Sequence, residues 1–278
     1  FLSVISRVGC EIWRRSMTVA YQLERAGTKL HRAFVQRRPL GSRDVRISLK
    51  YCGICHSDLV AANDKLGGGI FPMVPGHEMV GVVTDLGSKV CGVAEGDFVG
   101  VGCVADSCRT CRSCKAGDEH YCDAGFMLSF NSRDNEGRVN YGGYSSDYIV
   151  DHHYLVPLPK GADLARMAPL LCGGVTVYTP LKRFGVGSDS TICVLGMGGL
   201  GHLAIQFAAA MGARVLAVSR SETKRADARR FGADVALDPA GDDLQDWIGQ
   251  CDLIINTISD SHDLNRWLPL LRRGGKLC

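Results

Sequence analysis

Three short segments of this chain place cysteine and histidine where they can bind a metal ion. Residues 53–58 read GICHSD, residues 75–78 read PGHE, and residues 171–173 read LCG. Proteins hold zinc mainly through Cys sulfur and His nitrogen, and a catalytic site uses three such ligands so that one position stays open for substrate. We therefore predict a catalytic zinc site formed by Cys55, His77 and Cys172.

A denser cluster of cysteines has the spacing C-x2-C-x2-C-x7-C. Four thiolates at this spacing can surround one tetrahedral zinc in a loop that has little core of its own. Because the protein would fill all four positions, such a metal would be structural. An iron–sulfur cluster is the alternative, and the lack of a proline after the last cysteine speaks against it. The candidate ligands are Cys108, Cys111, Cys114 and Cys122.

A glycine-rich segment, GMGGLG at residues 196–201, follows an apolar run at 191–195 and opens a helix expected over about 200–211. Glycines there permit a tight turn and let a pyrophosphate approach the helix N-terminus closely. We predict dinucleotide binding, against the alternative of a glycine-rich turn that only packs a helix on a strand. The candidate residues are Gly196, Gly198, Gly199, Leu200 and Gly201.

The end of the next strand, expected over residues 214–218, indicates which dinucleotide binds. An NAD site usually carries Asp or Glu at this point, where the carboxylate bonds the ribose 2′-hydroxyl. This chain has hydroxyls and cations instead, which suit a 2′-phosphate. We predict NADP(H), against the alternative that the cations form only a solvated helix face. The residues concerned are Ser219, Arg220, Ser221 and Lys224.

The composition is typical of a globular protein with two domains, since 278 residues are 46% hydrophobic and 22% charged. The net charge of +3 comes without a long run of Lys and Arg, so no nucleic-acid partner is expected. The longest apolar run, 168–181, is too short to span a bilayer, so no membrane partner is expected. Thirteen cysteines, clustered as above, favour metal binding over disulfides and a reducing compartment, which we take as the cytoplasm.

The pattern of the sequence changes near residue 160. Over residues 17–160, short β-like runs alternate with Gly, Pro and Asp, which predicts an all-β, barrel-type domain that includes a cysteine-rich lobe at 103–123. Over residues 161–278, apolar strands alternate with helices, which predicts an α/β fold with a doubly wound parallel sheet. Residues 1–16 match neither pattern, and we expect an extension without a defined fold.

Six motifs, in this order along the chain, support a family assignment. They are residues 53–58, 75–78, the four-cysteine lobe, 142–145 (GGYS), 168–178 (APLLCGGVTVY) and 196–202 (GMGGLGH). Together they resemble the zinc-dependent alcohol dehydrogenases of the medium-chain dehydrogenase/reductase superfamily. Within that superfamily they look most like the cinnamyl-alcohol-dehydrogenase-type, NADPH-linked aldehyde reductases. The resemblance runs from about residue 21 to the last residue.

The resemblance implies a GroES-like catalytic domain followed by a Rossmann domain, with the active site between them, and a homodimeric enzyme acting on small aldehydes and alcohols. By position, Cys55, His77 and Cys172 would hold the catalytic zinc. Glu78 would lie just behind the metal, as a ligand that exchanges with substrate or water. Asp58 would accept a hydrogen bond from His77 and fix its tautomer.

The resemblance also implies a route for the proton. In the family, a Ser or Thr at the position of Ser57 passes a proton to the nascent alkoxide and receives it through the cofactor ribose from a histidine. Here that histidine position is Val60, which departs from the family, so either His56 or a chain of solvent completes the route, or proton transfer is slower. Thr176 would lie near the nicotinamide, and the backbone of residues 198–200 near the pyrophosphate.

Two alternatives remain at this stage. Family members continue beyond the position where this chain ends, so we expect an incomplete Rossmann sheet and a chain that is a piece of a longer enzyme. The alternative is an inactive fragment, or a catalytically silent protein that binds zinc and dinucleotide. A DNA-binding use of the four-cysteine lobe is disfavoured by its acidic neighbours, Asp106, Asp118, Glu119 and Asp123.

Overall fold

The computed structural model describes residues 17–278, and within that range the side chain of Asp242 is not described. The chain divides into two compact units, one ending at Cys172 and one running from Gly173 to Cys278. The extension expected at residues 1–16 lies outside the described residues. The domain boundary expected after residue 160 stays a prediction.

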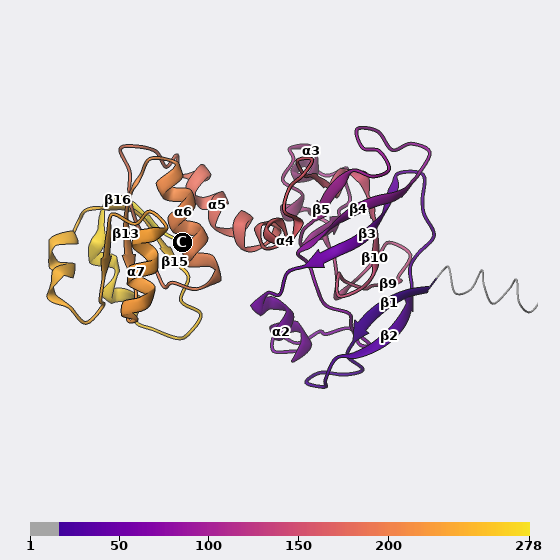
Figure 1. The fold of residues 1–278 in the computed structure, drawn as a ribbon, viewed down its shortest axis with the longest axis horizontal. Coiled ribbons are helices and arrows are strands. Elements are labelled where there is room, and N and C mark those ends of the chain that lie inside the picture. Colours follow the sequence, from indigo (N-terminus) through magenta and orange to yellow (C-terminus); the bar gives the residue numbers. More distant parts are fainter. Residues whose placement is uncertain (1–16) are drawn as a thin grey trace, which may run out of the picture. The chain divides into compact units, whose positions relative to one another are not determined.

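The first unit is built around a five-stranded antiparallel sheet with the order β10-β3-β4-β5-β11 (Figure 1). Its core consists of side chains from alternate positions, among them Val45, Ile47, Met79 and Tyr148, each at most 1% exposed. Alternation of this kind places one face of each strand inward, as expected for a half-buried sheet. The strands are β3 (Asp44–Cys52), β4 (Met79–Leu86), β5 (Phe98–Val101), β10 (Asp147–Asp151) and β11 (Val156–Pro157).

Shorter elements of the first unit carry the segments that can bind metal. Helix α2 (His56–Ala62) follows β3, and the four-cysteine lobe lies between the paired strands β6 (Val104–Asp106) and β7 (Met127–Leu128). The remaining elements are β1 (Met17–Gln22) paired with β2 (His31–Gln36), β8 (Ser132–Arg133) paired with β9 (Val139–Asn140), helices α3 (Arg112–Lys115) and α4 (Leu164–Met167), and 3₁₀ turns η1 (Glu119–Tyr121), η2 (His152–Tyr154) and η3 (Ala168–Leu171).

The turn η3 packs directly on the sheet of the first unit, against β3, β4 and β5. Glycines make room for it, because a Cβ on Gly100 would lie 2.7 Å from Leu171 Cδ1 and one on Gly102 would lie 3.0 Å from the Leu171 carbonyl oxygen. A larger residue at Gly100 would force the Leu171 side chain to move, and one at Gly102 would press on the backbone of η3. The chain just before Cys172 is thereby held against the sheet.

The second unit is a five-stranded parallel sheet with the order β14-β13-β12-β15-β16, which follows the strand order of a Rossmann sheet over five consecutive positions. Strand β12 is buried on both faces, since Ile192 and Val194 join one core cluster and Cys193 and Leu195 the other. Helices cover the first cluster, and the second is closed by Trp247 and Trp267. The elements are α5 (Gly173–Arg183), β12 (Thr191–Leu195), α6 (Gly199–Ala210), β13 (Arg214–Val218), α7 (Glu222–Arg230), β14 (Val235–Leu237), η4 (Asp242–Trp247), β15 (Cys251–Asn256), η5 (Leu264–Arg266), η6 (Leu268–Leu270) and β16 (Leu271–Leu277).

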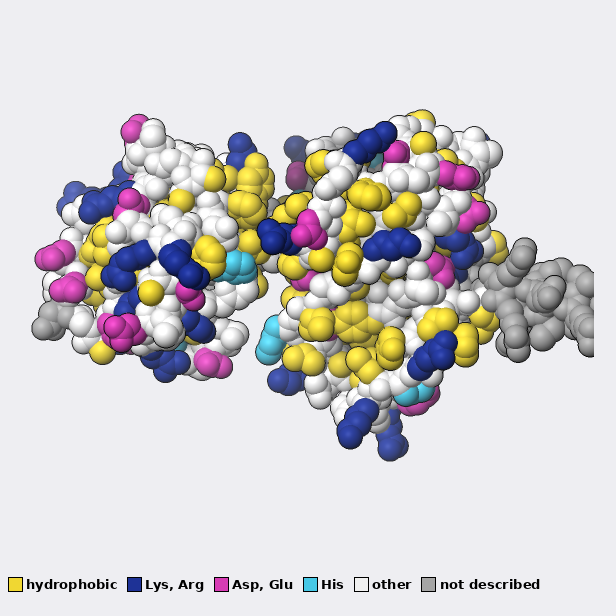
Figure 2. All heavy atoms as spheres, in the orientation of Figure 1, with side chains coloured by type: hydrophobic (Ala, Val, Ile, Leu, Met, Phe, Trp, Pro, Cys, Tyr) yellow, Lys and Arg dark blue, Asp and Glu magenta, His cyan; other side chains and the backbone are white. Residues whose placement is uncertain are grey.

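The surface of the first unit carries several exposed apolar side chains. Figure 2 shows hydrophobic side chains gathered over the part of this unit that carries α2 and the β1–β2 hairpin. The exposed large hydrophobic residues of this unit include Ile54 at 83% and Leu66 at 89%. Among residues 17–278, no helix has both the length and the apolar character needed to cross a membrane.

Replacing Ile254 with alanine should destabilise the second unit. Ile254 is 0% exposed and packs in the cluster that contains Trp247 and Trp267, so its truncation leaves a cavity and should lower the free energy of unfolding by about 2–5 kcal/mol. Urea unfolding followed by tryptophan fluorescence measures the change. The control Ile248→Ala, at a side chain 49% exposed, should change it by less than about 1 kcal/mol; equal effects of the two substitutions would contradict this account of the core.

Candidate functional site

Four side chains of the first unit converge on one point. One ligand atom from each of Cys55, His77, Glu78 and Cys172 lies within 4.8 Å of the others. The segments that supply them are the turn after β3, the residues just before β4, and the residue that follows η3. The structure therefore brings together the three predicted zinc ligands, with Glu78 beside them.

Local structure explains why Cys55 points into this cluster. Cys55 is the N-cap of α2, with extended backbone angles, and its sulfur accepts a hydrogen bond from the Ser57 N–H at 3.5 Å. Asp58 completes the capping box by accepting a hydrogen bond from the Cys55 N–H at 3.0 Å. A capping residue is held in one backbone conformation, so the thiol direction is set by the start of the helix.

Asp58 joins three segments of the site. Besides the Cys55 N–H, its carboxylate accepts hydrogen bonds from the Gly76 N–H at 3.0 Å and the Tyr144 hydroxyl at 2.9 Å, and its Oδ1 lies 3.1 Å from His77 Nδ1. The side chain is 3% exposed. Burial raises the pKa of Asp58, but the hydrogen bonds with His77 and the Cys55 N–H outweigh burial, and the pKa lies below its usual value. The carboxylate is thus ionised and fully engaged.

His77 is oriented by this carboxylate. Its Nδ1 faces Asp58, so its Nε2 is the nitrogen left for a metal, and its ring stacks on Phe130 with centroids 5.7 Å apart. Burial lowers the pKa of His77, but hydrogen bonds with Asp58 and Cys172 outweigh it and raise the pKa to about 11. Asp58 and Cys172 thus stabilise a proton on this ring, and a metal ion would have to replace that proton to bind Nε2.

Glu78 is packed tightly behind His77. A Cβ on Gly53 would lie 1.8 Å from Glu78 Oε2, so only glycine leaves room for this carboxylate in its position. Glu78 is 5% exposed, and burial raises its pKa above the usual value. The Glu78 carboxylate lies close to the sulfurs of Cys55 and Cys172. Among the described residues, it forms no salt bridge.

The spacing of the sulfurs fits a shared metal ion. Cys55 Sγ and Cys172 Sγ lie 3.9 Å apart. Two thiolates that are each about 2.3 Å from a tetrahedral zinc lie about 3.8 Å apart, whereas bonded disulfide sulfurs lie about 2.05 Å apart. Two sulfurs, one imidazole nitrogen and one carboxylate oxygen are also a donor set that suits zinc.

The four-cysteine lobe forms a second cluster of the same kind. The sulfurs of Cys108, Cys111, Cys114 and Cys122 all lie within 4.8 Å of one another, and Cys108 Sγ and Cys114 Sγ are 3.9 Å apart. Backbone N–H groups point at the sulfurs: Cys108 donates to Cys122, Cys111 to Cys108, and Cys114 to Cys111, at 3.4 to 3.5 Å. Such bonds stabilise thiolates and leave them directed at a common centre.

The glycine-rich turn of the second unit has the geometry that a dinucleotide site needs. Gly196 has φ +88°, and a Cβ on Gly201 would lie 2.1 Å from the Gly196 carbonyl oxygen, so both positions require glycine. Gly198 is the N-cap of α6. A cavity of about 750 Å³ opens at the carboxyl ends of β12, β13 and β15, where parallel sheets of this order bind ligands.

Six of the predicted cofactor residues line this cavity: Gly196, Gly198, Ser219, Arg220, Ser221 and Lys224. Ser221 is the N-cap of α7 and accepts a hydrogen bond from the Lys224 N–H at 3.4 Å. Among the described residues, neither Arg220 nor Lys224 forms a salt bridge, whereas Arg225 is paired with Asp238. The cavity does not include Thr176, Gly199, Leu200 or Gly201 in its lining.

Comparison with known proteins decides the family. The model of the alcohol dehydrogenase GroES-like domain matches residues 41–160, and the model of the zinc-binding dehydrogenases matches residues 199–278. A probable formaldehyde dehydrogenase of Bacillus subtilis is 44% identical over 263 residues, which are 94% of this chain and 75% of that protein. The chain belongs to the zinc-dependent alcohol dehydrogenases of the medium-chain dehydrogenase/reductase superfamily.

Further relatives agree with this assignment of the dehydrogenase. An NADP-dependent alcohol dehydrogenase C of Mycobacterium tuberculosis is 42% identical, with 94% of this chain and 76% of that protein covered. The structure of a cinnamyl alcohol dehydrogenase from Sorghum bicolor superposes with a TM-score of 0.89 at 38% identity, over 94% of this chain and 75% of that one. The predicted family, fold class and enzyme class are confirmed.

Two functional features of the dehydrogenase were not assigned from its sequence. Tyr144 lies in a motif that indicated the family, but its bond to Asp58 follows only from the fold. Residues 257–262 line the cofactor cavity on the side of β15. Their position directly after an apolar strand of a parallel sheet was the signal that could have revealed them.

The remaining predicted residues of the dehydrogenase lie at or near the start of α2. Ser57 Oγ is 3.5 Å from Cys55 Sγ, and both Ser57 and His56 are exposed. Val60 is half-buried on the same helix. Among the described residues, the imidazole of the exposed His56 has no hydrogen-bond partner.

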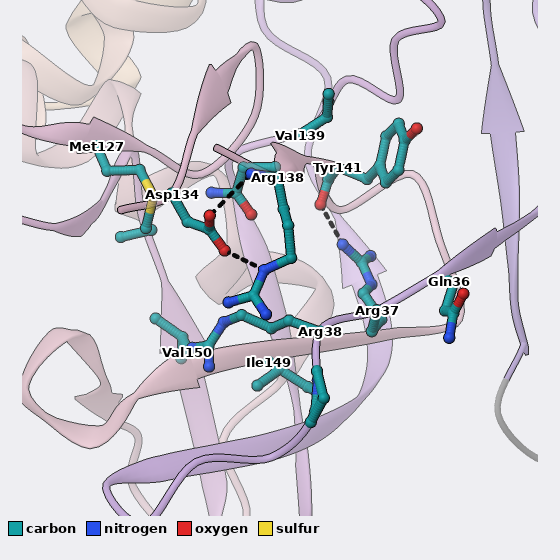
Figure 3. A pocket seen from close by; sticks show the side chains of 13 residues that line it. Gln36, Arg37, Arg38, Met127, Asp134, Arg138, Val139, Tyr141, Ile149 and Val150 are labelled. Carbon is teal, nitrogen blue, oxygen red and sulfur yellow. Dashed lines mark hydrogen bonds and ion pairs between the residues drawn. The ribbon is translucent and has the colours of Figure 1, made fainter. Parts of the chain in front are cut away.

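A separate cavity of about 430 Å³ lies away from these residues, between β10 and the β8–β9 hairpin (Figure 3). Its arginines are already engaged: Arg38 binds Asp44, Arg138 binds Asp134, and Arg37 donates to the backbone carbonyl of Tyr141. Because protein groups occupy these cations, the cavity offers no free charge for a ligand. Arg138 closes the loop of the β8–β9 hairpin, and Arg37 links the segment after this hairpin to β10 by donating to the carbonyl oxygens of Tyr141 and Asp147.

Replacing Asp58 with asparagine should weaken zinc binding at the Cys55 cluster. Asparagine cannot accept all four of the hydrogen-bond contacts that the carboxylate makes, so His77 and the Cys55 turn lose their orientation. Loss of such a partner costs about 10- to 100-fold in metal affinity. Competition with a chromogenic chelator measures the affinity of each variant for zinc. The control Asp85→Asn, at a carboxylate 55% exposed and paired with Arg46, should leave affinity unchanged; an Asp58→Asn variant with wild-type affinity would refute the assigned role.

Proposed function

We propose that this chain interconverts aldehydes and primary alcohols by zinc-dependent hydride transfer with NADP(H). The observation that carries the proposal is the meeting of Cys55, His77, Glu78 and Cys172 within 4.8 Å, around a histidine already oriented by Asp58. A Cys₂His set with a further exchangeable position is the donor arrangement of a catalytic zinc, rather than of a structural one.

Cys55, His77 and Cys172 would hold the catalytic zinc, and Cys108, Cys111, Cys114 and Cys122 the structural zinc, which makes two per chain. When bound, the catalytic ion acts as a Lewis acid on the substrate oxygen. Glu78 would be the ligand that gives way to substrate or water.

The cofactor residues of the second unit would hold NADP(H), which supplies the hydride to the carbonyl carbon. Gly196 and Gly198 would let the pyrophosphate reach the start of α6. Ser219, Arg220, Ser221 and Lys224 would bind the 2′-phosphate, since hydroxyls and unpaired cations line the cavity where an NAD site has a carboxylate. Gly199, Leu200 and Gly201, in the first turn of α6, would support the pyrophosphate, and Thr176 the nicotinamide.

Ser57 would pass the proton to the substrate oxygen, because its hydroxyl lies 3.5 Å from a ligand sulfur and is therefore beside the metal position. Val60 has no proton to give, so the next step would fall to the exposed His56 or to solvent. Proton transfer through solvent is slower than transfer through a fixed imidazole, because the water molecules must first become oriented.

The substrate would be an apolar, including aromatic, aldehyde. A mainly apolar cavity of about 510 Å³ contains Cys52 and Ile54, which flank the turn leading to Cys55, together with Tyr21, Leu30 and Tyr144. Apolar walls select substrates by area rather than by hydrogen bonds, which favours a broad range. We further propose a homodimer in the cytoplasm, where reducing conditions preserve the free thiols that both zinc sites need.

Replacing Cys172 with serine should remove the catalytic zinc and the activity together. Zinc measured by atomic spectroscopy should fall from two to one per chain, and NADPH-dependent reduction of benzaldehyde, followed at the nicotinamide band, should fall at least about 1,000-fold, because the carbonyl is no longer polarised. Cys111→Ser should also lower zinc to one while leaving the Cys55 cluster loaded. Wild-type protein that carries two zinc ions and NADPH yet shows no turnover would support a silent binding protein instead.

Replacing Arg220 with aspartate should reverse the choice of cofactor. A carboxylate repels the 2′-phosphate and can bond a ribose 2′-hydroxyl, so the dissociation constant for NADPH should rise about 10- to 100-fold relative to that for NADH. Quenching of protein fluorescence during cofactor titration measures both constants. Arg230→Asp, the same charge change at the far end of α7, is the control; an unchanged ratio in Arg220→Asp would mean that the 2′-phosphate lies elsewhere.

A further inference from the structure

The turn η2 (His152–Tyr154) contacts the four-cysteine lobe through three side-chain interactions. Asp151, the N-cap of this turn, binds Arg109 with 2.7 Å between Oδ2 and a guanidinium nitrogen. His153 Nε2 lies 2.7 Å from Glu119 Oε1. The Tyr154 hydroxyl donates to Ser107 Oγ at 2.7 Å. The turn at the end of β10 is therefore attached to the lobe at three separate residues of the lobe.

One of these contacts leads directly to a metal-binding sulfur. Ser107 Oγ lies 3.2 Å from Cys114 Sγ, and both residues are 8% exposed, so solvent hardly competes for this contact. Among the described residues, the hydrogen bonds and ion pairs of Asp151 and His153 include no cysteine sulfur; their partners are backbone groups and the side chains of Arg43, Arg109, Glu119 and His152. Tyr154 is thus linked to a sulfur ligand through a single intervening hydroxyl.

The direction of this hydrogen-bond chain follows from the chemistry of the sulfur. A metal-bound cysteine is a thiolate and has no proton to donate. The Ser107 hydroxyl must then donate to Cys114 Sγ, which leaves its oxygen lone pairs to accept the Tyr154 hydroxyl. Each donor polarises the next, so the Tyr154 hydroxyl strengthens the bond that reaches the sulfur.

The surrounding charges hold the chain in place. Arg109 donates to Asp106 at 3.0 and 2.6 Å, the residue directly before Ser107, and its guanidinium lies over the Tyr154 ring at 5.4 Å from the centroid. Arg109 itself has φ +58°, a conformation that non-glycine residues rarely adopt. The strained backbone is held by the ion pairs on both sides of the guanidinium, as expected where surrounding structure fixes an unfavourable conformation.

We propose that Ser107 and Tyr154 are positioning residues for the metal of the four-cysteine lobe, acting by a hydrogen-bond chain that orients the Cys114 thiolate and slows metal release. This inference rests on the proposed structural zinc. It predicts that metal retention depends on a tyrosine outside the lobe, on a turn that supplies no ligand.

Zinc release to a chromogenic chelator tests the proposal on the intact protein. The variants Tyr154→Phe and Ser107→Ala should each release the lobe zinc about 10-fold faster than the wild type, in the range that loss of an outer partner of a ligand produces. Ser107→Thr keeps the hydroxyl and should restore slow release. The release phase that belongs to the lobe is the one missing from Cys111→Ser.

A spectroscopic comparison separates this effect from simple anchoring. In protein loaded with cobalt, Tyr154→Phe and Ser107→Ala should shift the thiolate-to-metal absorption band of the lobe, because the hydrogen bond to sulfur is weakened or lost. Glu119→Gln breaks the ion pair with His153 without touching a sulfur and is the matched control. It should leave both the release rate and the band unchanged.

Each outcome bears on one of the two claims. Wild-type protein without metal in the lobe would overturn the structural zinc and this inference with it. Metal in the lobe combined with wild-type release from Tyr154→Phe and Ser107→Ala would overturn the inference alone. Equal acceleration by Glu119→Gln with no band shift in any variant would also overturn it, since the turn would then only anchor the lobe.

Discussion

The carboxylate of Asp58 is the interaction on which the catalytic cluster depends. It binds the first turn of α2, the turn before β4 and the hydroxyl of Tyr144 at the same time. A buried carboxylate is costly unless hydrogen bonds surround it, so these segments are held together by the need to satisfy one charge. Cys55 and His77 then have fixed directions before any ion is present.

The second sulfur, that of Cys172, reaches the cluster by a different physical route. Cys172 makes no contact with Asp58 among the recorded hydrogen bonds of residues 17–278; it follows η3, which is pressed against β3, β4 and β5 where Gly100 and Gly102 leave space. Shape complementarity, and not charge, therefore sets the position of this ligand. The metal centre combines an electrostatic constraint on one side with a packing constraint on the other.

In the second unit, the packing of the sheet likewise determines where the site forms. Strand β12 is buried on both faces, which fixes the sheet, and the cofactor cavity then arises where neighbouring strands end. Arg220 and Lys224 are not engaged in salt bridges among the described residues, whereas Arg225, the residue after Lys224 on α7, is paired with Asp238. The unpaired cations at this edge of the sheet can bind a phosphate, whereas Arg225 stabilises the fold through its ion pair with Asp238.

Local sequence by itself determined the ligands' chemical types, the glycine turn and most strands. Strands β12 and β13 coincide with the predicted strands at 191–195 and 214–218, because a parallel strand covered on both faces is apolar over most of its length. The spacing of Cys108 to Cys122 likewise predicted one cluster, because the chain between them is too short to separate the sulfurs widely. Tertiary structure alone decided the bond from Tyr144 to Asp58, the cavity wall at 257–262 and the link from Tyr154 to Cys114. These contacts join residues far apart in sequence, and spacing carries no information about pairs that only the packing of separate strands and turns brings within hydrogen-bond distance.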